Sequence, residues 1–128
     1  MSGYEKKRIR IGIAGTGSMA NAHASAFKGM EGVELASCFD VVSSRAQEFA
    51  ARHGVKHVAG SLDELLEACD AVSVVTPDRF HAEISLQVLA AGRHLLSEKP
   101  LTVTLAEARK VAAAARKASV NGIVHMVN

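Results

Sequence analysis

This sequence of 128 residues has no long apolar run, only two cysteines, and only a small excess of positive charge. No stretch approaches the roughly 20 consecutive apolar residues that a membrane-spanning helix needs. The first ten residues also lack the apolar region of a signal peptide, so we expect a cytoplasmic protein with no membrane partner. The formal net charge of +2 creates no strong field for nucleic acid, and we predict no nucleic-acid partner.

The two cysteines, Cys38 and Cys69, stand in apolar surroundings and form no CxxC pair. Neither has a histidine at the spacing of a zinc ligand, and the six histidines show no metal spacing of their own. We therefore predict two buried, reduced thiols and no metal site.

Composition and length predict one folded domain. Apolar residues make up 48% of the chain and charges of both signs are mixed, which argues against disorder. A chain of this length can bury roughly two thirds of its unfolded surface, and no linker or low-complexity segment divides it. We expect a single domain over residues 1–128, with a flexible basic tail at 1–8 and a core at 9–127.

The stretch from Ile9 to Ala20 reads IRIGIAGTGSMA and combines a strand with a glycine turn. Isoleucines at alternate positions predict a strand over 9–13, and residues 15–20 match the pattern G-x-G-x-x-G/A. In that pattern the first glycine permits a sharp turn and the second lets a pyrophosphate approach the backbone. Amide groups of the following helix then face the phosphates. Alone, the same letters also describe a glycine-rich loop without chemical consequence.

The residues after the turn favour a dinucleotide site. One face of the next helix is expected to be apolar and buried: Met19, Ala22, His23, Ala26, Phe27 and Met30. On that face His23 is expected to be a packed core residue rather than a ligand. A second strand over 33–39 stops at Asp40, which lies 23 residues after Gly17. An acidic residue at about this distance takes the adenosine ribose hydroxyls in dinucleotide-binding domains.

Helices and strands alternate along the rest of the chain. Helix starts are predicted by capping-box patterns at Ser44 with Gln47, Ser61 with Glu64 and Thr104 with Glu107. Leu105 is placed on the buried face of the last helix, and Phe80 on that of a further helix between Thr76-Pro77 and Gly92. The expected strands cover 9–13, 33–39, 55–58, 71–75, 93–96 and 121–127. Six strands alternating with helices predict an α/β fold, a doubly wound parallel sheet of the Rossmann type in the order 3-2-1-4-5-6.

Ligands of such a sheet bind beyond the carboxyl ends of the strands, where the strand order reverses. Lys99, in the sequence Ser97-Glu98-Lys99-Pro100, is the one cation at these ends that could reach a reacting group. A lysine beside a nicotinamide can carry the proton of a substrate hydroxyl. Spacing alone fits a solvated loop lysine equally well, and Glu98 is equally ambiguous.

Taken together, the motifs resemble those of a known family. The resemblance is carried, in order, by GIAGTGSMA with His23 following, Asp40, Thr76-Pro77 with His81, and Glu98-Lys99-Pro100. These are similar to the N-terminal half of the glucose-fructose oxidoreductase, inositol dehydrogenase and rhizopine-catabolism (Gfo/Idh/MocA) family, over residues 9–128. Members are nicotinamide-dependent oxidoreductases that act mostly on sugars, inositols and their derivatives.

The resemblance implies a role for each motif. The pyrophosphate would be held by Gly15, Thr16, Gly17, Ser18 and Met19, and the cofactor cleft would be lined by Thr76, Pro77 and His81. Glu98 would stand on the nicotinamide side, and Lys99 would be the catalytic residue at the substrate hydroxyl. Asp40 would take the ribose and repel a 2′-phosphate, so NAD is the expected cofactor. Arg45 would admit NADP if it turned toward the ribose.

Family members continue into a substrate domain that these 128 residues lack. We therefore expect the cofactor-binding half of an oxidoreductase whose full-length form takes a sugar or polyol and could form a homo-oligomer. The sequence leaves open the substrate, and whether the chain is a fragment or a standalone domain. A nonenzymatic dinucleotide sensor and a domain for S-adenosylmethionine remain as alternatives. Glu98-Lys99-Pro100 favours the enzyme, because a sensor needs no lysine at the hydride end.

Overall fold

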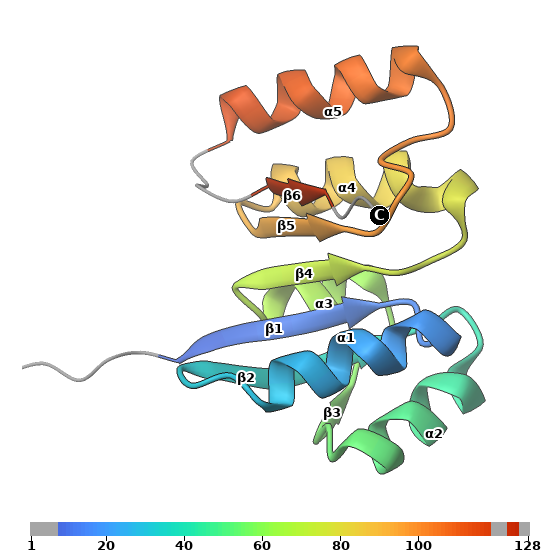
Figure 1. Cartoon of the computed structure of the whole chain (residues 1–128), viewed down its shortest axis with the longest axis vertical. Helices are drawn as coiled ribbons and strands as arrows, with labels where there is room; N and C mark the ends of the chain where they lie inside the picture. The colour runs from blue at the N-terminus through green and yellow to red at the C-terminus, as the bar shows by residue number, and fades with distance from the viewer. Residues whose placement is uncertain (1–7, 119–122, 126–128) are drawn as a thin grey trace, which may run out of the picture.

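A parallel sheet runs through the molecule. The computed structural model describes residues 8–118 and the backbone of 123–125 (Figure 1). Five strands follow the order β3-β2-β1-β4-β5, and a three-residue strand, β6, pairs with β5 at the sheet edge. The strands are β1 (Ile9–Ala14), β2 (Val33–Phe39), β3 (His57–Val58), β4 (Ala71–Val74), β5 (His94–Ser97) and β6 (Ile123–His125). The predicted doubly wound parallel sheet is confirmed.

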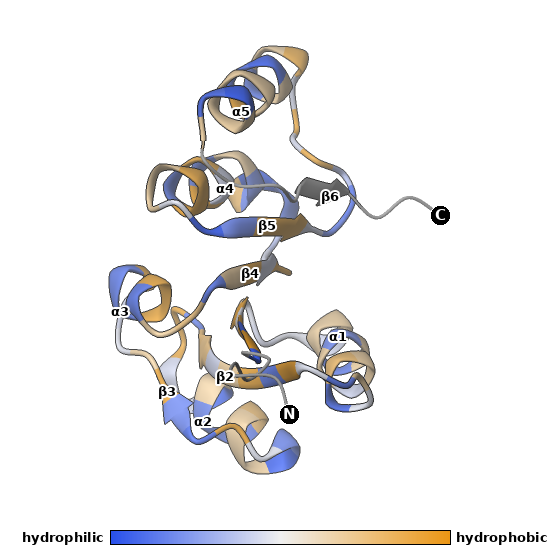
Figure 2. Cartoon of the chain, turned by 90° about the vertical axis from the view of Figure 1, so that its left-hand side faces the viewer, coloured by the Kyte–Doolittle hydropathy of each residue, from blue (hydrophilic) through white to orange (hydrophobic). Residues whose placement is uncertain are grey.

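Helices cover both faces of the sheet. They are α1 (Ser18–Lys28), α2 (Ser43–His53), α3 (Leu62–Glu67), α4 (His81–Ala90) and α5 (Leu105–Lys117), with a 3-10 turn, η1 (Asp78–Phe80), before α4. Figure 2 shows α1 on one side of the sheet and α3 and α4 on the other. Helix α5 packs against α4. None of the helices in the described residues combines the length and the apolar content of a membrane span.

Two of the three predicted helix caps are confirmed. The Ser61 and Thr104 side chains each accept a hydrogen bond from the backbone N–H three residues on, and Thr104 forms a full capping box with Glu107. The cap at Ser44 was wrong. Helix α2 begins at Ser43 after an uncapped Val42, whose N–H donates to Asp40 at 2.8 Å. The turn that Asp40 stabilises therefore places the N-cap at Val42, two residues earlier than predicted.

The predicted buried face of α1 was partly wrong. Met19 and Met30 are 53% and 49% exposed, and Ala22 and Ala26 are also exposed. The helix buries Ala20 and Ala24 in their place. A face of small residues lets the helix approach the sheet closely, as the third position of the glycine pattern requires. His23 is buried as predicted.

Two hydrophobic clusters lie on opposite faces of the sheet. One packs Ile13 and Cys38 against α1 and α2, and the larger packs Val72, Val74 and Leu95 against α3, α4 and Val111 of α5, with Cys69 among them. Both thiols are free and buried, as predicted, and burial raises the pKa of each to about 11.

Other expectations about boundaries and faces need correction. Leu105 is 66% exposed at the start of α5, and Phe80 is 37% exposed in η1, so neither lies on a buried helix face. Strand β3 covers two residues rather than the four predicted. Most of the predicted tail, and residues 121, 122, 126 and 127 of the last predicted strand, lie outside the described residues.

Gly15 gives a direct test of how the turn after β1 is built. Its φ is +96°, and an added Cβ would lie 2.8 Å from the backbone of Val75 and Thr76. Gly54, the C-cap of α2, also has a positive φ, of +71°, but open space around it. We expect Gly15→Ala to lower the free energy of unfolding by about 3 kcal/mol or more, because backbone strain and overpacking add. Gly54→Ala should cost only about 1 kcal/mol. Equal losses in chemical denaturation would contradict this account.

Candidate functional site

Four chain segments meet at the carboxyl edge of the sheet, on the right of Figure 1. Backbone hydrogen bonds join them: Gly15 N–H to Phe39 O at 2.8 Å, Val75 N–H to Ala14 O at 2.8 Å, and Glu98 N–H to Val74 O at 3.0 Å. The ends of β1, β2, β4 and β5 are thus fixed relative to one another. The sequence predicted that its site residues would gather here.

The glycine turn leaves space where a phosphate could approach. An added Cβ on Gly17 would meet no atom within 4 Å outside the adjacent residues, although Gly15, two residues earlier, is tightly enclosed. Gly17 is the N-cap of α1, where no side chain caps the helix and no acidic residue stands in the first turn. The helix itself therefore supplies no anion for its N-terminal amides or for the positive end of its dipole. The residues of the turn fit the pyrophosphate of a dinucleotide.

Asp40 is bound to the same turn. Its Oδ2 accepts from Thr16 N–H at 2.9 Å and from Thr16 Oγ1 at 2.8 Å, and its Oδ1 accepts from Val42 N–H at 2.8 Å. Partial burial opposes ionisation, but these hydrogen bonds and nearby Arg45 outweigh it and hold the pKa of Asp40 below its usual value. Of the roughly four acceptor positions of a carboxylate, three are used by these bonds, and one on Oδ1 can still accept from a ligand hydroxyl.

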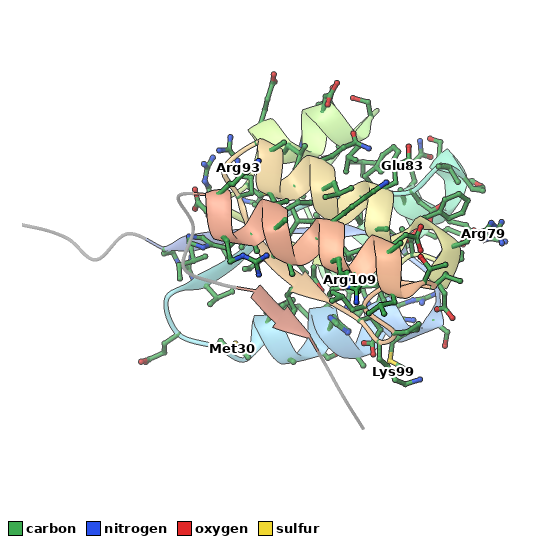
Figure 3. All side chains as sticks on the ribbon, turned by 90° about the horizontal axis from the view of Figure 1, so that it is seen from above. Met30, Arg79, Glu83, Arg93, Lys99 and Arg109 are labelled. Carbon is green, nitrogen blue, oxygen red and sulfur yellow. The ribbon has the colours of Figure 1, made fainter. Side chains whose placement is uncertain are left out.

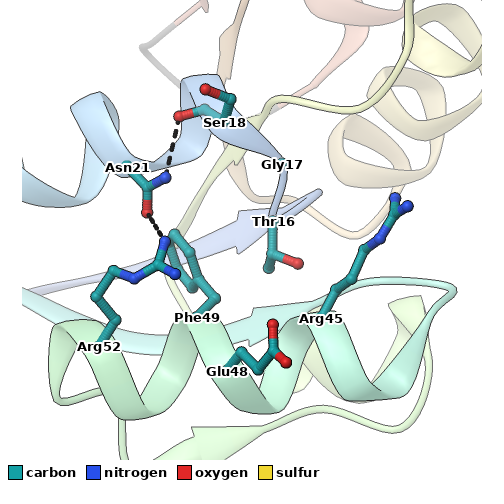
Figure 4. A pocket seen from close by; sticks show the side chains of 8 residues that line it. All are labelled: Thr16, Gly17, Ser18, Asn21, Arg45, Glu48, Phe49 and Arg52. Atoms are coloured by element: carbon teal, nitrogen blue, oxygen red, sulfur yellow. Dashed lines mark hydrogen bonds between the residues drawn. The ribbon is translucent and has the colours of Figure 1, made fainter.

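A pocket of about 450 Å³ opens between the glycine turn and α2 (Figure 4). Arg45 lies on one side of it, while Asn21 and Arg52 lie across from it. Asn21 donates to Ser18 O and accepts from Arg52, each at 3.2 Å. Two guanidinium groups and one carboxylate, that of Glu48, therefore line a space beside the helix N-terminus, which favours an anionic ligand.

Thr76 and Pro77 follow β4 at the same edge. The Thr76 hydroxyl oxygen is buried and has no hydrogen-bond partner among the described residues, whereas Pro77 is exposed. An unsatisfied buried hydroxyl is uncommon in a folded protein, and the described residues contain one other, that of Ser85 in α4.

His81 lies behind these loops. It is 1% exposed, and its Nδ1 and Nε2 lie 2.6 Å from Pro100 O and 2.8 Å from Thr76 O. Both of its ring nitrogens are therefore occupied by backbone carbonyls of the two segments predicted to flank the cofactor. The structure places His81 beneath the expected cleft, with neither nitrogen free for a ligand.

Glu98 is bound to His23 rather than to solvent. His23 Nε2 lies 2.7 Å from Glu98 Oε2, and His23 Nδ1 lies 2.7 Å from Ser73 Oγ. Burial of Glu98 opposes its charge, but the hydrogen bonds from His23 and from Lys99 N–H prevail and lower the pKa of Glu98. A charged carboxylate is thus fixed at the end of β5.

Lys99 stands at the rim of the same edge. Its backbone N–H donates to Glu98 Oε1 at 3.2 Å, and its side chain is exposed (Figure 3). The described residues contain no group of three metal-ligating side chains. The chemistry that this edge offers is therefore anion binding at the turn and a cation beside a carboxylate at β5.

Sequence reasoning missed several residues of this region, including Glu48 and Phe49 of the pocket. Ser73, fully buried in β4, was read as part of an apolar run, although a lone serine between valines was a signal for an internal hydrogen bond. Asn21 and Arg52 line the pocket but lie on helix faces that periodicity assigns to solvent. Nothing in their spacing could have revealed that they meet.

A family model described as "Oxidoreductase family, NAD-binding Rossmann fold" matches residues 9–126. Among curated proteins, 4-carboxy-2-hydroxymuconate-6-semialdehyde dehydrogenase of Sphingobium sp. is 36% identical over 121 residues, which are 93% of this chain and 38% of the relative. Glucose-6-phosphate 3-dehydrogenase of Bacillus subtilis is 35% identical over 111 residues, 87% of this chain and 31% of the relative.

Solved structures give the same result. GenD2 from gentamicin A biosynthesis, in complex with NAD, superposes with a TM-score of 0.86 at 34% identity and covers 98% of this chain and 36% of its own. Biliverdin reductase of Synechocystis sp., in complex with biliverdin and NADP+, has a TM-score of 0.82 at 30% identity, over 91% of this chain and 37% of its own.

The chain spans about a third of the length of the relatives it matches. The fold, the glycine turn and the resemblance of the motifs agree with the match over 9–126. The chain therefore belongs to the Gfo/Idh/MocA oxidoreductase family and carries that family's NAD-binding Rossmann fold.

Proposed function

We propose that this chain is the dinucleotide-binding domain, with its core at 9–127, of an NAD(P)-dependent oxidoreductase acting on a sugar or polyol. The observation that carries the proposal is the open space at Gly17, at the uncapped N-terminus of α1 and beside the fixed ends of β2, β4 and β5. Pyrophosphate would bind at residues 15–19, and the adenosine ribose at Asp40. Substrate would enter from the rim that carries Lys99.

The carboxyl end of β5 would serve the reacting half of the cofactor. A bound nicotinamide supplies hydride transfer to or from carbon. In this proposal the fixed Glu98 carboxylate faces the nicotinamide side, and the exposed Lys99 ammonium reaches the substrate oxygen and handles its proton. The exposed Lys99 beside the hydrogen-bonded Glu98 carboxylate favours the enzyme hypothesis over a pure binding module, because binding alone needs neither group.

The proposal keeps the substrate-binding wall outside this chain. The relatives are about three times as long, and orientation and exclusion of water need more than one open sheet edge. We expect the isolated 128-residue chain to bind the cofactor but to turn over no sugar or polyol at a useful rate.

Calorimetric titration with NAD tests the proposal, and Gly17 locates the site. Gly17→Ala should weaken NAD binding by at least about tenfold, because the new methyl group would occupy the space of the pyrophosphate. The fold should be unchanged, since no atom outside the adjacent residues lies within 4 Å of that methyl group. The matched control is Gly29→Ala at the other end of α1, where the nearest atom outside the adjacent residues is 3.6 Å away. No heat with NAD at millimolar concentration, or equal affinities of the two variants, would refute the assignment.

Asp40 should set the preference for NAD over NADP. Asp40→Asn removes the charge that repels a 2′-phosphate, so the ratio of NAD affinity to NADP affinity should fall by roughly tenfold. A tenfold change corresponds to about 1.4 kcal/mol of like-charge repulsion. Thr16→Val is the control: it deletes one hydrogen bond to Asp40 without changing any charge. It should leave the ratio unchanged. If both variants shifted the ratio equally, the shape of the turn rather than the charge would set the preference.

A further inference from the structure

Two buried histidines hold the segment Glu98–Pro100 from opposite sides. His23 reaches it from α1 and contacts the Glu98 carboxylate at 2.7 Å, and His81 reaches it from α4 and contacts Pro100 O at 2.6 Å. The two side chains are among the most buried polar groups of the described residues, at 7% and 1% exposure. Lys99 lies between the two points of attachment.

The first attachment has a defined direction. The Glu98 carboxylate can only accept, so His23 Nε2 must donate to it. His23 Nδ1 meets the hydroxyl of Ser73, which is fully buried in the middle of β4. The carboxylate is thereby connected through one imidazole ring to the centre of the sheet.

This arrangement is not a nucleophilic triad, although it joins a serine, a histidine and a glutamate. Ser73 is 0% exposed, so no substrate can reach its hydroxyl. The glutamate, at the other end, is the member that lies at the sheet edge, with 16% of its side chain exposed. The buried Ser73 and His23 therefore serve to hold the Glu98 carboxylate at the sheet edge.

The second attachment joins two loops. His81 contacts carbonyl oxygens at both ring nitrogens, Thr76 O after β4 and Pro100 O after β5. Carbonyl oxygens only accept, so each contact is a hydrogen bond only when that nitrogen carries a proton. A neutral ring hydrogen-bonds one of the two carbonyls at a time, and its buried position between them keeps the loop after β4 in contact with the segment Glu98–Pro100.

We propose that His23 and His81 are positioning residues: they hold the Glu98 carboxylate and the backbone of Lys99 in place for the nicotinamide half of the cofactor. This inference rests on the proposed function. Neither histidine touches the cofactor in it; each acts through the segment Glu98–Pro100. Lys99 keeps its side chain exposed while its backbone is fixed on both sides.

The test compares two ligands of the purified chain, NAD and ADP-ribose. Both contain the adenosine, the pyrophosphate and the second ribose, but ADP-ribose lacks the nicotinamide ring. The ratio of their dissociation constants therefore isolates what the protein contributes at the nicotinamide end. Glu98→Gln shows how much of that contribution depends on the carboxylate.

His23→Leu and His81→Leu should each lower the preference for NAD over ADP-ribose by about three- to tenfold while leaving ADP-ribose affinity nearly unchanged. Combining His23→Leu with Glu98→Gln should add little to either change alone, because both act through one contact. The glutamine variants of the two histidines, which keep an N–H donor, should restore part of the preference. They also serve if a leucine variant does not fold.

The matched control is His57→Leu. His57 Nδ1 lies 2.7 Å from Ser37 Oγ and its Nε2 lies 3.4 Å from Glu64, so the same three residue types meet, but on β3, β2 and α3. This variant should leave the ligand ratio unchanged.

The inference would be overturned by additive effects of His23→Leu and Glu98→Gln, by a ligand ratio unaffected by the histidine variants, or by the same loss in His57→Leu. Failure of the wild-type chain to bind either ligand would instead refute the proposed function. Binding of both with no dependence of the ratio on Glu98 would leave dinucleotide binding intact and overturn the placement of the carboxylate, and with it the inference.

Discussion

The close approach of Gly15 to the end of β4 is the constraint on which the rest of the site depends. The backbone of the turn passes so near Val75 and Thr76 that no side chain fits, and its φ of +96° disfavours any residue but glycine. Because of this contact, α1 begins only three residues after Gly15, at the end of β1. Its N-cap, Gly17, borders open space. The contact also brings the ends of β1 and β4 to the same edge, where the order of strands reverses.

The charged groups at this edge divide into two kinds. Asp40 and Glu98 are held by hydrogen bonds from Thr16, Val42, His23 and Lys99 N–H, which keep the pKa of each carboxyl group below its usual value despite partial burial. Arg45 and Lys99 are exposed. Fixed carboxylates with exposed cations form a preorganised site, since the anionic groups need not move when a ligand arrives.

The sequence was a good guide where backbone geometry dictates residue type. The glycine pattern, the alternating isoleucines and the caps at Ser61 and Thr104 each depend on local chemistry, and each was found where expected. Tertiary packing was harder to foresee. Periodicity placed Met19 in the core, but the close contact between α1 and the sheet selects Ala20 and Ala24. The link from Ser73 through His23 to Glu98 spans three elements, so no local pattern could predict it. The catalytic role of Lys99 stays a prediction, and so do the cofactor-binding roles of residues 15–19, Asp40, Arg45, Thr76, Pro77, His81 and Glu98.

The central claim is that one dinucleotide lies across the carboxyl ends of β1, β2, β4 and β5. A crystal structure of the chain with NAD tests this most directly. The account predicts pyrophosphate oxygens within hydrogen-bond distance of the amides at Gly17 and Ser18, a ribose hydroxyl on Asp40, and the nicotinamide ring beside Glu98 and Lys99. NAD bound in the reverse direction, or bound away from the glycine turn, would contradict it.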